Sequence, residues 1–68
     1  MAARTIVLIG KTGKRHSFVP VRDEREEVKV HARHLGEEVE RVEELVYSPT
    51  GRTPWERRPR PDLLALLR

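Results

Sequence analysis

Cysteine is absent from the 68 residues of this chain, which excludes disulfide bonds and zinc sites built from thiolates. Asparagine and glutamine are absent as well, and the single methionine is Met1. Proteins of thermophiles contain few of these thermolabile residues and many charged ones, and charged residues make up 37% of this chain. The composition therefore indicates a small protein adapted to high temperature.

Long hydrophobic runs are also missing. No apolar stretch approaches the roughly 20 residues that a transmembrane helix needs, and the run at residues 6–9 is too short for the core of a signal peptide. We therefore expect a cytoplasmic protein that does not contact membranes. A chain of this length forms a single small domain. We expect its core at residues 1–47, a Pro/Arg-rich linker at 48–61 and a docking segment at 62–68.

Charge is divided into three blocks along the chain. Residues 1–22 carry five basic side chains and no acidic one, residues 23–47 carry nine acidic against four basic, and residues 48–68 carry five arginines against two acids. Two basic ends thus flank an acidic middle. Such ends either form a face that binds nucleic acid or fold onto the acidic middle of the same molecule.

The N-terminal part has the pattern of a β-hairpin. Residues 5–9 and 17–21 are rich in β-branched and apolar residues, which predicts two strands. Gly10 and Gly13 lie between them and suit a tight turn. Pro20 cannot donate a backbone hydrogen bond, so we expect the second strand at an edge of the sheet.

The middle of the chain allows two interpretations. Its apolar residues recur at alternating spacings of four and three, as in a heptad seam, which predicts a long amphipathic acidic helix over residues 23–47, bent or broken at Gly36. Alternatively, the alternation around Val30 predicts a strand at residues 27–35, a turn at Gly36 and a further strand at 42–47. The seam consists of Val28, Ala32, Leu35, Val39, Val42 and Val46.

The C-terminal part combines a linker with a short helix. Residues 48–61 contain four prolines and four arginines, which predicts an extended linker, and Asp62 caps the apolar residues 63–67. The predicted fold is therefore α+β: an N-terminal β-hairpin, a long acidic helix, and a Pro/Arg-rich tail with a short C-terminal helix. The alternative is a small all-β four-stranded sheet or barrel.

Catalytic and metal chemistry find little support in the sequence. The loop at residues 10–15 lacks the first glycine and the Ser/Thr of a P-loop. His31, His34 and Glu38 would share one face of a helix, but two histidines without a second ligand motif do not define a metal site. We therefore expect no enzymatic activity, no metal and no cofactor.

Two functions from different classes remain. The first is weakly sequence-specific binding of DNA or RNA by a basic hairpin and tail, with Trp55 either stacking on bases or anchoring the tail to the core. The second is a structural or protein-interaction homodimer, because one hairpin cannot cover a long helix. The predicted phosphate contacts are Lys11, Lys14, Arg15, Arg57, Arg58 and Arg60, and the predicted dimer interface is Val28, Leu35, Val39, Val42 and Val46.

Overall fold

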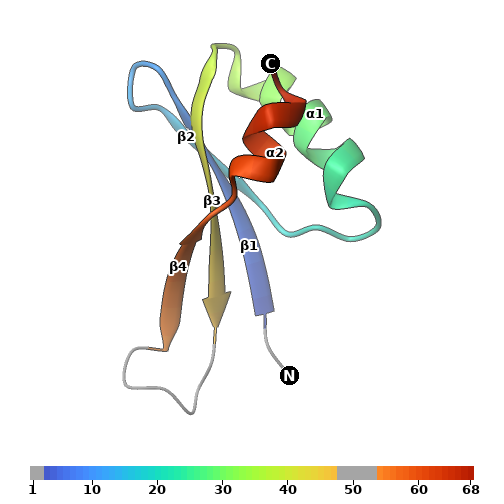
Figure 1. Cartoon of the computed structure of the whole chain (residues 1–68), viewed down its shortest axis with the longest axis vertical. Helices are drawn as coiled ribbons and strands as arrows, with labels where there is room; N and C mark the ends of the chain where they lie inside the picture. The colour runs from blue at the N-terminus through green and yellow to red at the C-terminus, as the bar shows by residue number, and fades with distance from the viewer. Residues whose placement is uncertain (1–2, 48–53) are drawn as a thin grey trace.

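The computed structural model describes residues 3–47 and 54–68, which form a four-stranded antiparallel sheet and two helices (Figure 1). The strand order across the sheet is β2-β1-β3-β4. Neither helix within these residues has the length or apolar character needed to cross a membrane. The elements in chain order are β1 (Ala3–Gly10), β2 (Arg15–Phe18), α1 (Glu24–Leu35), β3 (Val39–Tyr47), β4 (Trp55–Pro59) and α2 (Pro61–Leu66).

The predicted N-terminal hairpin is present. Strands β1 and β2 pair antiparallel, with Ile6 opposite Phe18 and Ile9 opposite Arg15. The turn uses Gly13 at φ 91°, a left-handed conformation that glycine adopts without steric cost. The Gly10 N–H donates to the Lys14 carbonyl at 2.8 Å and closes the loop.

The predicted long helix is wrong. Helix α1 has 12 residues, is capped at its start by Asp23 and ends at Gly36, whose φ is 79°. The chain then turns back as β3, so residues 39–47 are strand. The all-β alternative is wrong as well, because residues 27–35 belong to α1, although its last strand falls within β3.

A β-bulge explains why the strand β3 looked like the continuation of a helix. Ile9 pairs with Arg41 and Gly10 pairs with Val39, so Glu40 is an extra residue in β3. The bulge lets Val39 and Val42 both face the core, although their spacing of three is unusual for a strand. Both are buried. The apparent heptad pattern thus consists of the apolar residues of α1 followed by those of a bulged strand, β3.

Part of the predicted linker is a strand. Residues 55–59 form β4 at the edge of the sheet, with Pro59 opposite Glu43. An edge strand tolerates proline, since one side of its backbone needs no partner. The predicted short C-terminal helix is present as α2, which begins at Pro61. Residues 48–53 of the predicted linker lie outside the described residues.

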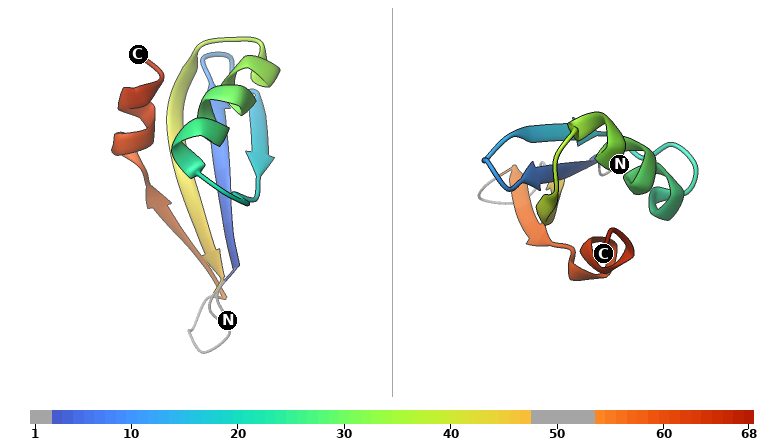
Figure 2. Two further views of the ribbon diagram at one scale, coloured as in Figure 1. Left: turned by 90° about the vertical axis from the view of Figure 1, so that its right-hand side faces the viewer. Right: turned by 90° about the horizontal axis from the view of Figure 1, so that it is seen from above.

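Both helices cover the same face of the sheet. Figure 2 shows α1 over β1 and β2, with α2 alongside it. The opposite face has no helix of residues 3–47 or 54–68 against it, and we call it the open face. The core between the sheet and the helices consists of Ile6, Leu8, Phe18, Val28, Leu35, Val39, Val42 and Leu63.

This core contains most of the predicted dimer interface. Val28, Leu35, Val39 and Val42 are at most 7% exposed in the single chain, and Val46 is partly buried. The first four are therefore not available to a second copy. The reason is the shortness of α1, which leaves the sheet and α2 able to cover it. Homodimerisation stays a prediction, and it would need another surface.

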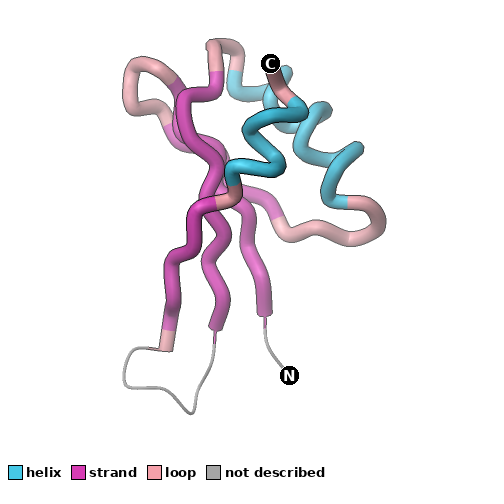
Figure 3. Tube along the Cα trace, viewed as in Figure 1, coloured by secondary structure: helices cyan, strands magenta, loops and turns pink. Residues whose placement is uncertain are grey.

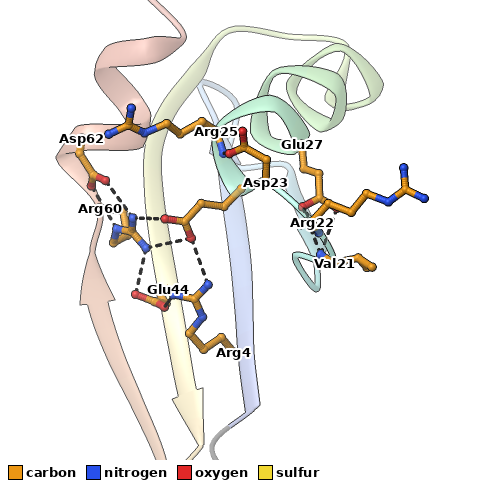
Figure 4. A network of polar contacts seen from close by, with 10 residues as sticks. Arg4, Val21, Arg22, Asp23, Arg25, Glu27, Glu44, Arg60 and Asp62 are labelled. Atoms are coloured by element: carbon orange, nitrogen blue, oxygen red, sulfur yellow. Dashed lines mark hydrogen bonds and ion pairs between the residues drawn. The ribbon is translucent and has the colours of Figure 1, made fainter.

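An ionic network joins both basic ends to the acidic middle (Figure 4). Arg60 donates to Glu24 at 2.7 Å, to Glu44 at 3.1 Å and to Asp62 at 2.8 Å. Arg4 lies 3.3 Å from Glu24 and 3.2 Å from Glu44. The network ties β1, α1, β3 and α2 together around the buried Glu44. Basic side chains of the two ends thus pair with acidic side chains of the middle segment within the same molecule.

This network predicts a loss of stability in acid. Hydrogen bonds from Arg60 hold the pKa of Glu24 and of Asp62 below their usual values of 4.5 and 3.8. A carboxylate with a lowered folded-state pKa stabilises the fold above its unfolded-state pKa, and that contribution disappears as the pH falls through the folded-state value. We expect the free energy of unfolding, measured in urea, to decrease below about pH 4.5. The decrease should be shallower in Glu24→Gln, and equal pH profiles would contradict the prediction.

Candidate functional site

The open face is defined by the register of the sheet. Residues directly opposite each other in antiparallel strands point to the same side, and neighbours along a strand point to opposite sides. Since Leu8 and Val42 face the core, Ile9 and Arg41 face the open side. The open face therefore comprises Thr5, Val7 and Ile9 of β1, Arg15 and Ser17 of β2, Arg41, Glu43, Leu45 and Tyr47 of β3, and Trp55, Arg57 and Pro59 of β4.

One end of the open face is basic. Arg15 and Arg41 lie opposite Ile9 on either side, so they form a row across β2, β1 and β3. Both arginines are exposed, while Ile9 between them is buried. Within the described residues, neither arginine forms an ion pair with an acidic side chain. Two guanidinium groups therefore remain for contact with an anion here.

The other end of the open face is aromatic. Tyr47 and Trp55 lie opposite each other on β3 and β4, with ring centroids 5.0 Å apart and ring planes inclined at 49°. Trp55 is 48% exposed. This end lies where β1, β3 and β4 extend beyond the helices, at the bottom of Figure 3. Trp55 thus contacts Tyr47 and leaves much of its ring surface in solvent.

The two ends are linked by a mixed polar and apolar surface. Arg57 lies opposite Leu45, one row above the aromatic pair, and its Nε is 3.8 Å from a carboxylate oxygen of Glu43. Tyr47 lies six positions after Arg41 on β3, which corresponds to about 20 Å along the strand. The open face is thus an extended track with cations at one end and a tilted pair of aromatic rings at the other.

The tip of the hairpin is held by the turn between α1 and β3. The Glu37 carboxylate accepts hydrogen bonds from the Thr12 N–H at 3.0 Å and from the Thr12 hydroxyl at 2.7 Å. These bonds hold the pKa of Glu37 below its usual range. The Lys11 N–H donates to the Glu38 carbonyl at 3.0 Å. Glu37 and Glu38 therefore lie beside the loop that carries the exposed Lys11 and Lys14.

Gly10 is required by this arrangement. A Cβ at Gly10 would overlap the carboxylate of Glu37. Any larger residue would therefore displace the side chain that holds Thr12. The loop predicted as a phosphate contact is thus anchored to its own chain, which leaves the charged ends of Lys11 and Lys14 exposed but fixes the backbone between them.

The six predicted phosphate contacts do not all lie on one face. Arg15 and Arg57 lie on the open face, and Lys11 and Lys14 lie at the hairpin tip near Arg15. Arg58 lies opposite Glu44 and so faces the helix side, where it pairs with Glu56 at 3.0 Å. Arg60 is engaged in the ionic network.

Arg41 was not predicted as a site residue. The alternation of residues 41, 43, 45 and 47 is that of a strand, but the heptad interpretation of the same segment concealed it. Once β3 is recognised, its alternation assigns Arg41 and Tyr47 to one face.

The histidines form a separate cluster on the helix side. His31 and His34 of α1 are joined by His16 of β2, which was not predicted to lie near them. Glu38 lies beyond the end of α1 at Gly36 and does not belong to this group. Burial lowers the pKa of the His31 imidazole, and the neighbouring His16 and His34 lower it further.

Comparisons with known proteins give no match. The chain fits no protein-family model, and neither curated proteins nor solved structures show significant similarity to it. The assignment of a function therefore depends on the chemistry of the open face and of the side chains around it.

Proposed function

We propose that this chain is a non-enzymatic cytoplasmic module that binds single-stranded nucleic acid along the open face. Among the described residues, an aromatic pair with an exposed Trp55 and two arginines without acidic partners share one face that no helix covers, and this observation carries the proposal. Single-strand binders combine stacking on aromatic rings with a positively charged track for the phosphates. Tyr47 and Trp55 would supply the stacking surface, and Arg15 and Arg41 the phosphate contacts.

Single strands suit this face better than duplexes. The bases of a duplex are already stacked on one another, so they cannot stack on Trp55 without being unpaired. The bases of a single strand are accessible from both sides. The separation of about 20 Å between the basic and aromatic ends suits an extended strand, one part of which would stack a base on the aromatic end while phosphates further along contact the basic end.

Sequence preference is expected to be weak. Stacking accepts every base, since every base has an aromatic face, and phosphate contacts carry no sequence information. The open face adds few fixed hydrogen-bonding groups, chiefly the hydroxyls of Thr5 and Ser17. The proposal therefore predicts similar affinity for mixed-sequence DNA and RNA strands.

The first test uses the single tryptophan of the chain as a reporter. Adding a mixed-sequence single-stranded oligonucleotide should quench the fluorescence of Trp55. In anisotropy titrations with a labelled strand, Trp55→Ala should raise the Kd by about 5- to 100-fold, the value of one stacked base. The Arg15→Ala/Arg41→Ala variant should also lower the log–log salt slope by about 0.7 for each lost contact.

A matched control separates a specific face from general attraction. The double variant Arg25→Ala/Arg33→Ala removes the same charge from exposed positions of α1, on the opposite side of the sheet. It should bind almost as well as the wild type. If it loses as much affinity as Arg15→Ala/Arg41→Ala, binding is a general effect of net charge and the open face is not the site.

The alternative function is a structural or protein-interaction homodimer. The observation that favours it is the apolar content of the same open face, which includes Val7, Leu45, Tyr47 and Trp55. Sedimentation equilibrium distinguishes the two functions. A dimer that persists at high salt, together with no binding of nucleic acid at low salt, would favour the homodimer.

A further inference from the structure

The three histidines of the chain converge at one place between β2 and α1. His16 comes from β2, whereas His31 lies fifteen residues further along, one turn before His34 on α1. One ring nitrogen from each of the three lies within 4.8 Å of the others. This cluster lies on the helix side of the sheet, since His16 is opposite the core residue Leu8. The open face therefore does not account for it.

The rings are held at angles that let their nitrogen atoms meet. His16 Nε2 lies 2.8 Å from His31 Nδ1, so the lone pair of at least one of these nitrogens points towards the other ring. Phe18 stacks on the His31 ring, with centroids 4.1 Å apart and planes nearly parallel. His34 approaches His31 edge-on, with an interplanar angle of 84°. The packing of Phe18 thus orients the central imidazole of the three.

The separations are close to those of a tetrahedral metal site. Zinc binds histidine nitrogen at 2.0–2.1 Å, which places two ligand nitrogens about 3.3 Å apart. The pair His16–His31 is shorter than this and the limit for all three pairs is 4.8 Å. Small rotations of the side chains would therefore bring the three nitrogens to coordination distance.

The surroundings of His31 favour its neutral imidazole, the form that binds metals. Burial lowers the pKa of His31, and the neighbouring rings oppose its protonation further. Glu27, one turn earlier on α1, acts in the opposite direction and raises the pKa. Its carboxylate accepts hydrogen bonds from the backbone N–H groups of Val21 and Arg22. Glu27 thus remains near the cluster as a fixed negative charge.

We propose that His16, His31 and His34 bind a divalent transition-metal ion, of which Zn²⁺ is the best fit. Three imidazoles complete three positions of a tetrahedron, and a water molecule would fill the fourth. His34 is exposed, so this position is accessible to solvent and to a further ligand. The ion would join the edge strand β2 to α1. This proposal differs from the sequence-based expectation of no metal and is independent of nucleic-acid binding.

The test measures metal binding on the tag-free, EDTA-treated full chain. Calorimetric titration with ZnCl₂ should give one site per chain, and Co²⁺ should produce the visible absorption of a tetrahedral site. Saturating Zn²⁺ should also raise the melting temperature, since it binds only the folded chain. His34→Ala should lower the Zn²⁺ affinity at least about tenfold, because it removes a direct ligand. This variant should disturb the fold least, because His34 is exposed and takes no part in the His16–His31 hydrogen bond.

Arg33→Ala, at the adjacent exposed position, is the matched control and should bind Zn²⁺ like the wild type. His16→Ala serves as a second ligand variant, and circular dichroism verifies that each variant is folded. The proposal is overturned if wild type and His34→Ala bind Zn²⁺ equally, or if the wild type gives neither a Co²⁺ spectrum nor a Zn²⁺-dependent melting temperature. The cluster would then be a hydrogen-bonded packing contact between β2 and α1.

Discussion

Replacing Arg60 with alanine is expected to lower the free energy of unfolding by about 2 to 4 kcal/mol. The side chain of Arg60 is 17% exposed and contacts three carboxylates. Without it, Glu24 and the buried Glu44 would keep only Arg4 as a cationic partner among the described residues. A buried carboxylate without enough cationic or hydrogen-bonding partners lowers the free energy of unfolding. Urea denaturation at pH 7 followed by circular dichroism measures the loss.

Arg58→Ala is the matched control for this prediction. Arg58 is also an arginine near the C-terminus, but its partner Glu56 is exposed, and exposed ion pairs contribute little to stability. This variant should unfold almost like the wild type. In addition, Glu44→Gln should recover part of the loss when combined with Arg60→Ala, because the two residues are coupled. Equal losses in Arg60→Ala and Arg58→Ala would show that the network does not support the fold.

The second large effect is expected from Leu63→Ala. Leu63 is 1% exposed and is the residue by which α2 enters the core. A helix of six residues is not stable alone, so its position depends on packing against the core, where Leu63 is fully buried and Leu64 and Leu67 are partly buried. We expect a loss of about 2 to 4 kcal/mol, which lowers the Tm of a small domain by roughly 4–8 °C per kcal/mol.

Leu66→Ala provides the comparison for Leu63. Leu66 lies on the same helix but is 39% exposed. The same chemical change should therefore cost much less than at Leu63. Thermal unfolding of both variants measures the difference. If Leu66→Ala is as destabilising as Leu63→Ala, α2 is not docked through Leu63.

The sequence predicted those elements whose ends are marked by glycine or proline. The hairpin is marked by Gly10 and Gly13, and the short C-terminal helix is preceded by prolines. Gly36 was recognised as a possible end of a helix, and it is one. The strand β3 after Gly36 was expected only in the all-β alternative, as residues 42–47. The bulge at Glu40 gives β3 a spacing of three, which is the spacing of a helix.

The candidate site was only partly predictable for a related reason. Positive charge identified Arg15 and Arg57 as surface residues, but charge does not reveal which face a residue occupies. The face that a residue occupies depends on the register of the strands, and in this register Arg58 lies opposite Glu44 on the helix side. The contacts of Arg60 in the ionic network could not be predicted, because its partners Glu24 and Glu44 are far from it in sequence. The convergence of His16 with His31 likewise depends on how α1 packs over β2.

Mapping of backbone amide shifts by NMR tests the central claim most directly. The ¹⁵N-labelled chain is titrated with a mixed-sequence single-stranded oligonucleotide at low salt. Binding along the open face predicts shifts at Arg15, Arg41, Tyr47 and Trp55, including the indole N–H of Trp55, and little change along α1. Shifts centred on α1, with Trp55 unaffected, would contradict the assignment of the open face as the nucleic-acid-binding site.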